Sequence, residues 1–171
     1  FGAGLVVEEG RQGPSRGIIL ANNIVTECAN QTGGVQFFIK NTTTDSSIRL
    51  NDFWYKADED AVVDDGAAQY TAAAWNGRMP ASGEVVYGNV QEDPCFSGGE
   101  LPAGLDEEYR PRPDYFRLTD RAPETVRKTG NPLRGDADHG YSGESGKFEK
   151  DIYGNPREDW SMGACEYVPS P

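Results

Sequence analysis

The apolar residues of this chain fall into short runs rich in β-branched side chains, and glycine or proline separates one run from the next. Runs of this kind predict strands. The hydrophobic share is 36% and there are 21 glycines, which favours a loop-rich β protein over a helical bundle. The predicted strands cover residues 1–7, 17–25, 35–40, 47–55 and 85–90, and the alanine-rich stretch 67–75 is the best helix candidate.

The C-terminal end of the chain carries a second strong local signal. A Gly-Asn-Pro sequence at 154–156 predicts a tight turn, because glycine adopts unusual backbone angles and proline restricts its own. Gly163 and Ala164 are small enough to let two backbones approach closely. Arg157 and Glu166 carry opposite charges, and we expect them to pair across the gap between these elements.

These residues resemble the C-terminal end of secreted right-handed parallel β-helix proteins, which include the choice-of-anchor Q group and many polysaccharide-lyase-like proteins. Such proteins typically close with Asp-x-x-Gly-x-Pro-Arg, a short gap and Gly-Ala-aromatic-Glu, and similar residues stand at 151–157 and 163–167. Asp-Pro-Cys-Phe at 93–96 and Tyr-Phe-Arg-Leu at 115–118 are two further similarities. The order and spacing of these motifs make the resemblance more specific than any one of them.

The resemblance covers residues 17–167 and implies an all-β fold, the terminal coils of a right-handed parallel β-helix with a loop-rich C-terminal segment. On this interpretation residues 1–96 form the coils and residues 97–171 pack along the last of them, as one structural domain of a longer chain. The chain departs from the family pattern at Ala122, where the family has serine, and before Gly130, where the family has aspartate.

Asn22 and Asn23 interrupt the predicted strand at 17–25. One interpretation is an ordinary turn. The other follows from the resemblance: in parallel β-helices such asparagines often turn inward at a bend between two short strands. Their amides then bond to backbone and to asparagines above and below, which satisfies buried polar groups.

A parallel β-helix that starts with an apolar strand exposes unpaired N–H and C=O groups. Coils of this fold stack about 4.8 Å apart through backbone hydrogen bonds, so the first strand at 1–7 needs a neighbour. We therefore expect missing preceding coils, a cap or another copy of the protein at this edge.

The formal net charge of −12 makes nucleic acid and anionic membrane surfaces poor partners. No apolar run approaches membrane-spanning length, and the acidity fits an extracellular or cell-surface protein. The cysteines are Cys28, Cys95 and Cys165; we favour buried free thiols for the last two, and one disulfide stays an alternative in an oxidising compartment. A single histidine, His139, excludes a multi-histidine zinc site.

Two aromatic clusters are candidates for sugar binding, because sugars stack on aromatic faces beside polar groups. Trp54 and Tyr55 form the first, and Trp75 with Arg78 forms the second. The alternative is that Trp54 packs in the core and Trp75 anchors a loop, as large aromatic residues commonly do.

An acidic run supplies enough carboxylate oxygens for Ca²⁺, although charge runs of this kind are more often simply solvated. The candidate ligands are Asp58, Asp60, Asp64 and Asp65.

The resemblance implies an extracellular carbohydrate-active or carbohydrate-binding β-helix protein with polysaccharide as its partner. If it is an enzyme, a polysaccharide lyase or glycoside hydrolase is implied, and its catalytic coils could lie upstream of residue 1. The sequence itself selects no catalytic residue, because the acidic residues are too many to single out a pair. The alternative is a structural or adhesive β-solenoid subunit that stacks end to end on preceding coils or on another copy.

Overall fold

The computed structural model describes residues 3–28, 34–40, 46–55, 61–78, 85–98, 113–128, 150–151, 153–157, 161–163 and 167–168. Within these ranges the protein is largely strand, and its helices are short, so the expectation of a β protein is confirmed at this level. No helix in the described ranges has the length and apolar character that a membrane crossing requires.

The strands fall into three successive stretches of the chain, which we call tiers. The first tier contains β1 (Ala3–Val7), β2 (Ile19–Ala21) and β3 (Ile24–Thr26). The second contains β4 (Val35–Ile39), β5 (Ser47–Arg49) and β6 (Asp52–Trp54). The third contains β7 (Val63–Asp64), β8 (Gln69–Tyr70), α1 (Ala72–Asn76) and β9 (Val85–Tyr87).

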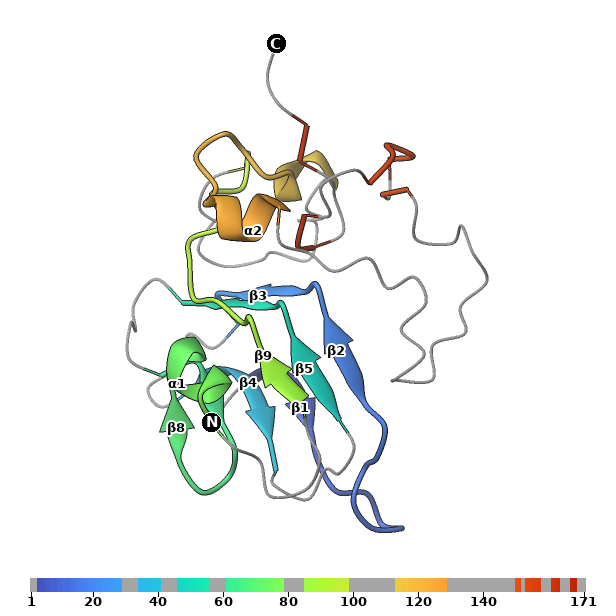
Figure 1. Ribbon diagram of the computed structural model, residues 1–171, viewed down its shortest axis with the longest axis vertical. Coiled ribbons are helices and arrows are strands. Elements are labelled where there is room, and N and C mark those ends of the chain that lie inside the picture. Colours follow the sequence, from blue (N-terminus) through green and yellow to red (C-terminus); the bar gives the residue numbers. More distant parts are fainter. Residues whose placement is uncertain are drawn as a thin grey trace, which may run out of the picture.

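Each strand of the first tier pairs in parallel with the strand at the equivalent place in the second tier, and β4 and β5 pair in the same way with β7 and β9 of the third. In place of a third-tier strand, β6 has a parallel bridge from Asp52 to Val90. The described sheets have the orders β1-β4-β7-β8, β2-β5-β9 and β3-β6, and only the β7–β8 pair is antiparallel. Residue registers carry across the tiers, so that Leu20 lies opposite Ile48, which lies opposite Val86. Figure 1 shows β2, β5 and β9 side by side.

The single strands predicted at 17–25 and 47–55 are each two strands, because a left-handed residue bends the chain between them. Asn22 and Leu50 have φ of 60° and 53°, and Gly88 has φ of 65° at the equivalent place in the third tier. Left-handed backbone costs an L-residue about 1–2 kcal/mol. Glycine avoids this cost, and a Cβ on Gly88 would also lie 2.6 Å from Leu50 Cδ2.

The main core lies between the three sheets. Its buried side chains come from the second and third tiers alike, and in the second tier the rings of Phe37 and Phe53 stack with centroids 5.3 Å apart. First-tier apolar residues that pack against this core are only partly buried. They are Leu5, Val7, Leu20 and Val25.

The helix predicted at 67–75 is shorter and starts later, at Ala72. Thr71 follows the last residue of β8 and is the N-cap of the helix, and its Oγ1 accepts from the Ala74 N–H at 3.1 Å. The residues before it belong instead to the β7–β8 hairpin, because the turn at Asp65 and Gly66 brings Tyr70 opposite Val63.

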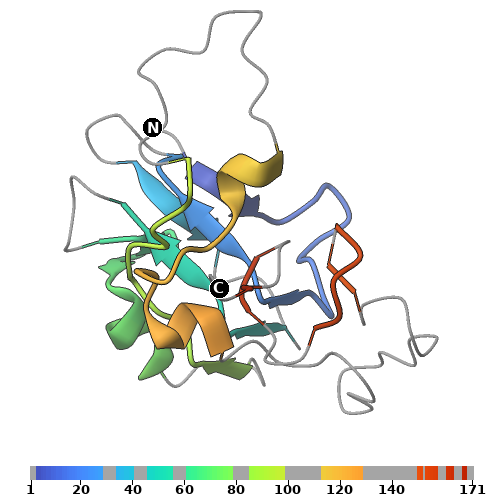
Figure 2. The ribbon, with the colours of Figure 1, turned by 90° about the horizontal axis from the view of Figure 1, so that it is seen from above.

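The C-terminal segment packs on the outside of the bends. Its own small core contains Leu118, Ala122, Val126 and Met162, and it contacts Ile24, Leu50 and Val90 of the three tiers. The segment includes η1 (Pro113–Phe116) and α2 (Glu124–Lys128), and α2 lies across the strands in the view from above (Figure 2).

The turn predicted at 154–156 is confirmed, because Gly154 has φ of 84° and its N–H donates to the Asp151 carbonyl at 3.0 Å. The close approach predicted at Gly163 is confirmed as well: its N–H donates to the Asn22 carbonyl at 2.7 Å. Arg157 donates to the carbonyls of Ser161 and Gly163, whereas Glu166 and Ala164 lie outside the described residues.

Candidate functional site

An asparagine follows the left-handed residue in each tier, and these three residues, Asn23, Asn51 and Asn89, form what we call the asparagine column. Each stands two positions after its strand, where the bend begins. Asn51 and Asn89 are fully or almost fully buried, and Asn23 is half-buried. The inward-bend interpretation of the Asn22–Asn23 pair is therefore confirmed for Asn23.

The column is a directional hydrogen-bond ladder between residues 28 and 38 positions apart. Asn51 Oδ1 accepts from the backbone N–H and the Nδ2 of Asn23, at 3.1 and 3.0 Å. Asn89 Oδ1 accepts from the same two groups of Asn51, at 3.2 and 2.9 Å. The ladder satisfies polar groups inside the stack and so aligns the three bends.

Asn76, the last residue of α1, ends the ladder in the third tier. Its Oδ1 accepts from the N–H and the Nδ2 of Asn89, at 3.0 and 2.9 Å, and its own Nδ2 donates to the Asn89 carbonyl at 2.6 Å. A helix residue therefore takes the place that a fourth strand bend would occupy.

Sequence reasoning missed Asn51, Asn76 and Asn89 as functional positions. A usable signal was present: each column asparagine lies two residues after a short β-rich run, and an apolar or acidic residue of the next run follows it. The irregular spacing of 28 and 38 residues conceals this repeat.

The first tier leaves three strand edges open on one side of the molecule. Among the described residues, β1, β2 and β3 each stand at the edge of their sheet. The opposite side is covered differently, since β8 pairs with β7 and α1 contacts both β8 and β9.

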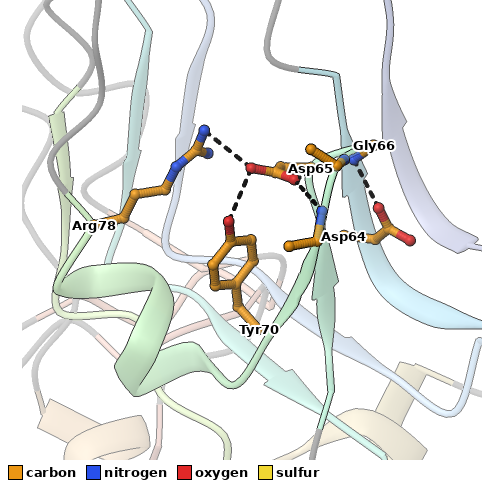
Figure 3. A network of polar contacts seen from close by, with 7 residues as sticks. Asp64, Asp65, Gly66, Tyr70 and Arg78 are labelled. Carbon is orange, nitrogen blue, oxygen red and sulfur yellow. Dashed lines mark hydrogen bonds and ion pairs between the residues drawn. The ribbon is translucent and has the colours of Figure 1, made fainter.

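Arg78 and Asp65 form the strongest charged network near the covered side (Figure 3). Arg78 Nη2 lies 2.9 Å from Asp65 Oδ2, which also accepts from the Tyr70 hydroxyl at 3.1 Å. The other oxygen of Asp65 accepts from the N–H groups of Ala67 and Ala68. The Arg78 guanidinium lies over the Trp75 ring, 4.8 Å from its centroid.

This network changes the pKa of both titratable partners of Arg78. Burial by itself raises the pKa of Asp65, but the N–H donors of Ala68 and Ala67 and the Arg78 charge together hold it below its ordinary value. The pKa of Tyr70 is raised, by burial and by its hydrogen bond to the Asp65 carboxylate. The ionised form of Asp65 is thus the one that the fold stabilises.

The predicted calcium ligands divide between described and undescribed residues. Asp58 and Asp60 lie outside the described part of the chain. Asp65 already holds Arg78, and Asp64 accepts from the Gly66 N–H at 2.7 Å and from Gln69 Nε2 at 3.1 Å. No cluster of three or more metal-ligating side chains occurs among the described residues.

The two aromatic candidates for sugar binding have different environments. Trp75 is 1% exposed and belongs to the core, so its face is closed to a ligand, and the prediction that it lines a groove is corrected. Arg78 is tied to Asp65 beside it. Trp54 and Tyr55 are half-buried, and Trp54 faces outward because its neighbour Phe53 points into the core.

Asp52 is a buried carboxyl on the side that faces the C-terminal segment. It stands between Ile24 and Val90 in register, and it is fully buried. One oxygen accepts from the Glu92 N–H at 3.0 Å, and no described group bonds to the other. Burial, with a smaller effect of the Glu92 and Asp93 charges, raises the pKa of Asp52 well above its ordinary value.

The described cysteines, Cys28 and Cys95, are free thiols, and Cys165 lies outside the described residues. Burial raises the pKa of both described thiols. Neither thiol is thereby activated as a nucleophile.

No protein-family model, curated protein or solved structure matches this chain.

Proposed function

We propose that the tiers are the closing coils of a right-handed parallel β-helix, and that the protein serves as the structural end unit of a β-solenoid. The observation that carries this proposal is the shared register of the three parallel ladders, in which each strand meets its equivalent one tier later. The asparagine column supports it, because it repeats at the same bend in every tier.

The two ends of the stack support a role as an end unit. At the covered end, α1 and β8 pack over the last strands, and Trp75 and Asn76 close the core and the ladder. At the open end, half-buried apolar side chains lie beside strand edges that pair with no further strand of the described ranges. A further coil on these edges would bury the apolar side chains and pair the backbone.

An extended chain tests this function. A second copy of residues 34–60 placed ahead of residue 1 supplies one more coil, because its linker to β1 matches the natural linker between β3 and β4 in length. We expect the amides of β1, β2 and β3 to gain protection from hydrogen exchange, and the melting temperature to rise. The same residues in scrambled order are the control.

Unchanged exchange at all three strands, with the added residues unfolded, would contradict the role as an end unit. This outcome would mean that the open edges are adequately solvated as they stand.

A second function, extracellular carbohydrate binding, is favoured by one observation, the half-buried neighbours Trp54 and Tyr55 at the end of β6 on the second tier. Adjacent aromatic faces suit the C–H surfaces of sugars. We expect Trp54→Ala to weaken retention of the protein in gels that contain an acidic or neutral polysaccharide. Tyr87→Ala is the matched control, because Tyr87 is exposed on β9, apart from this pair. Equal retention of both variants and the unaltered protein would contradict carbohydrate binding at this pair.

A further inference from the structure

The asparagine column has a direction. Each asparagine donates its backbone N–H and one amide N–H to the Oδ1 of the next, from Asn23 to Asn51, then to Asn89 and finally to Asn76. The three steps use the same two donors and the same acceptor. A coil ahead of the first tier would therefore meet Asn23 through the Asn23 Oδ1 atom.

The side chain of Asn23 differs from that of Asn51 in what its oxygen binds. Both amide nitrogens bond within their own tier and to the next one: Asn23 Nδ2 donates to the Ala21 carbonyl at 2.9 Å and to Asn51 Oδ1 at 3.0 Å. Asn51 Nδ2 also lies 3.0 Å from the Leu20 carbonyl of the preceding tier, so one of its hydrogens is shared. Asn23 Oδ1, in contrast, accepts from no described residue, and it is the acceptor that the side chain presents at the open end.

We infer that the open end binds a parallel β-coil that carries an asparagine at its bend, because such an asparagine can donate to Asn23 Oδ1. This inference rests on the proposed role as an end unit and names the chemistry of the coil that this role requires. A bend asparagine supplies both donors that the inner steps of the ladder use, its backbone N–H and its Nδ2. An apolar residue at that bend would supply the backbone donor alone.

A second copy of this chain does not supply these donors. Two copies stacked open end to open end would place one Asn23 Oδ1 against the other, acceptor against acceptor. The covered end of a copy offers a helix in place of a strand bend, because α1 and Asn76 stand there. The partner is therefore a coil that runs in the same direction as β1, β2 and β3.

The test compares two extended chains that differ in one residue. Both carry the added copy of residues 34–60, and one has Asn51→Leu in the added copy only. Leucine fills a similar space but removes the side-chain donor to Asn23, leaving a buried acceptor with one donor. We expect the equilibrium constant for docking of the added coil, measured by hydrogen exchange at β1–β3, to fall about tenfold, which corresponds to ~1.4 kcal/mol.

A third extended chain, with Phe53→Leu in the added copy, controls for general weakening of the coil. Its effect acts through packing, so it persists when Asn23 of the first tier is changed to Leu, which removes the acceptor, whereas the effect of Asn51→Leu in the added copy should then disappear. Coupling confined to the bend asparagine and position 23 supports the inference.

The outcomes separate the two proposals. If both added coils dock equally well, the asparagine selection is overturned while the role as an end unit stands. If neither coil docks, the role itself fails and the inference fails with it. A stable dimer of the unextended chain that protects β1, β2 and β3 from exchange would show that a second copy is the occupant, and would also overturn the inference.

Discussion

The first and third tiers contain the same bend and the same asparagine, yet they form the two ends of the stack in opposite ways. Within the described part of the chain, the first tier leaves Leu20 and its neighbours half-buried beside strand edges that have no partner strand, and Asn23 Oδ1 accepts no hydrogen bond. In the third tier, Trp75 fills the core and Asn76 ends the ladder. The covered end is therefore closed by β8 and α1, which lie between β7 and β9 in the chain, and not by the strands that repeat from tier to tier.

The largest expected effect comes from removing the side chain that closes the covered end. Trp75→Ala should lower the free energy of unfolding by about 3–5 kcal/mol, because it leaves a cavity in a fully buried site. Leu5→Ala, in the half-buried first tier, should cost less than about 2 kcal/mol. Urea denaturation of both variants checks the contrast, with Tyr87→Ala as a surface control. Equal losses at Trp75 and Leu5 would mean that the two ends are closed alike.

The asparagine column permits a second comparison on one type of residue. Asn51→Leu should cost about 3 kcal/mol, because it deprives Asn23 of its acceptor and Asn89 of its side-chain donor. Asn23→Leu should cost about 1 kcal/mol, because only one side of its amide is engaged. Thermal unfolding at one pH measures both. Similar losses at the two positions would show that Asn23 is as fully bonded as Asn51.

The Asp65–Arg78 network at the covered end should make the stability of the protein depend on pH. Asp65→Asn should cost ~2 kcal/mol at pH 7, since it removes the charge that Arg78 and the turn N–H groups stabilise. The pKa of Asp65 is lowered, so its contribution is complete above the unfolded value of ~3.9 and is lost as pH falls through the folded value. Urea denaturation from pH 7 to pH 2 tests this; the variant should lack that part of the decline.

Asp64→Asn is the matched control for this experiment. Its carboxylate accepts from the same hairpin turn, but the described ion pair belongs to Asp65. A pH dependence lost equally in both variants would argue against a special role for the Arg78 pair.

The smallest effect is expected on the side of the stack, where the C-terminal segment covers Asp52. Asp52→Asn should raise stability by about 1 kcal/mol at neutral pH, because it removes a buried charge with one unpartnered oxygen. The pKa of Asp52 is raised, so the folded state holds its proton more tightly, and the unaltered protein loses stability as pH rises from the ordinary carboxyl range through the raised value. The gain in the variant should therefore shrink as pH falls. A gain that is constant with pH would assign the effect to packing.

Local features were predictable from the sequence because they depend on neighbouring residues. The strand runs and the turn at Gly154 follow from β-branched composition and glycine geometry. The inward asparagine bend was one of two interpretations, and it came from the resemblance to parallel β-helix proteins. The splitting of 47–55 into two strands was missed, because Leu50 gives no local sign that it will take a left-handed conformation. Trp75 was misjudged for a related reason, since an aromatic beside Asn76 and Arg78 has the same local pattern on a surface and over a core.

The sequence by itself determined where this chain extends, where it turns and which residues carry a strong charge. Only the tertiary structure decided that Asn23 meets Asn51 and that Asn51 meets Asn89, across sequence separations of 28 and 38 residues. Backbone propensity acts over a few neighbours, whereas these bonds require whole strands to be in register. The same holds for the two ends of the tiers: among the described elements, a helix and a hairpin pack on the third tier, and none packs on the outer edges of the first.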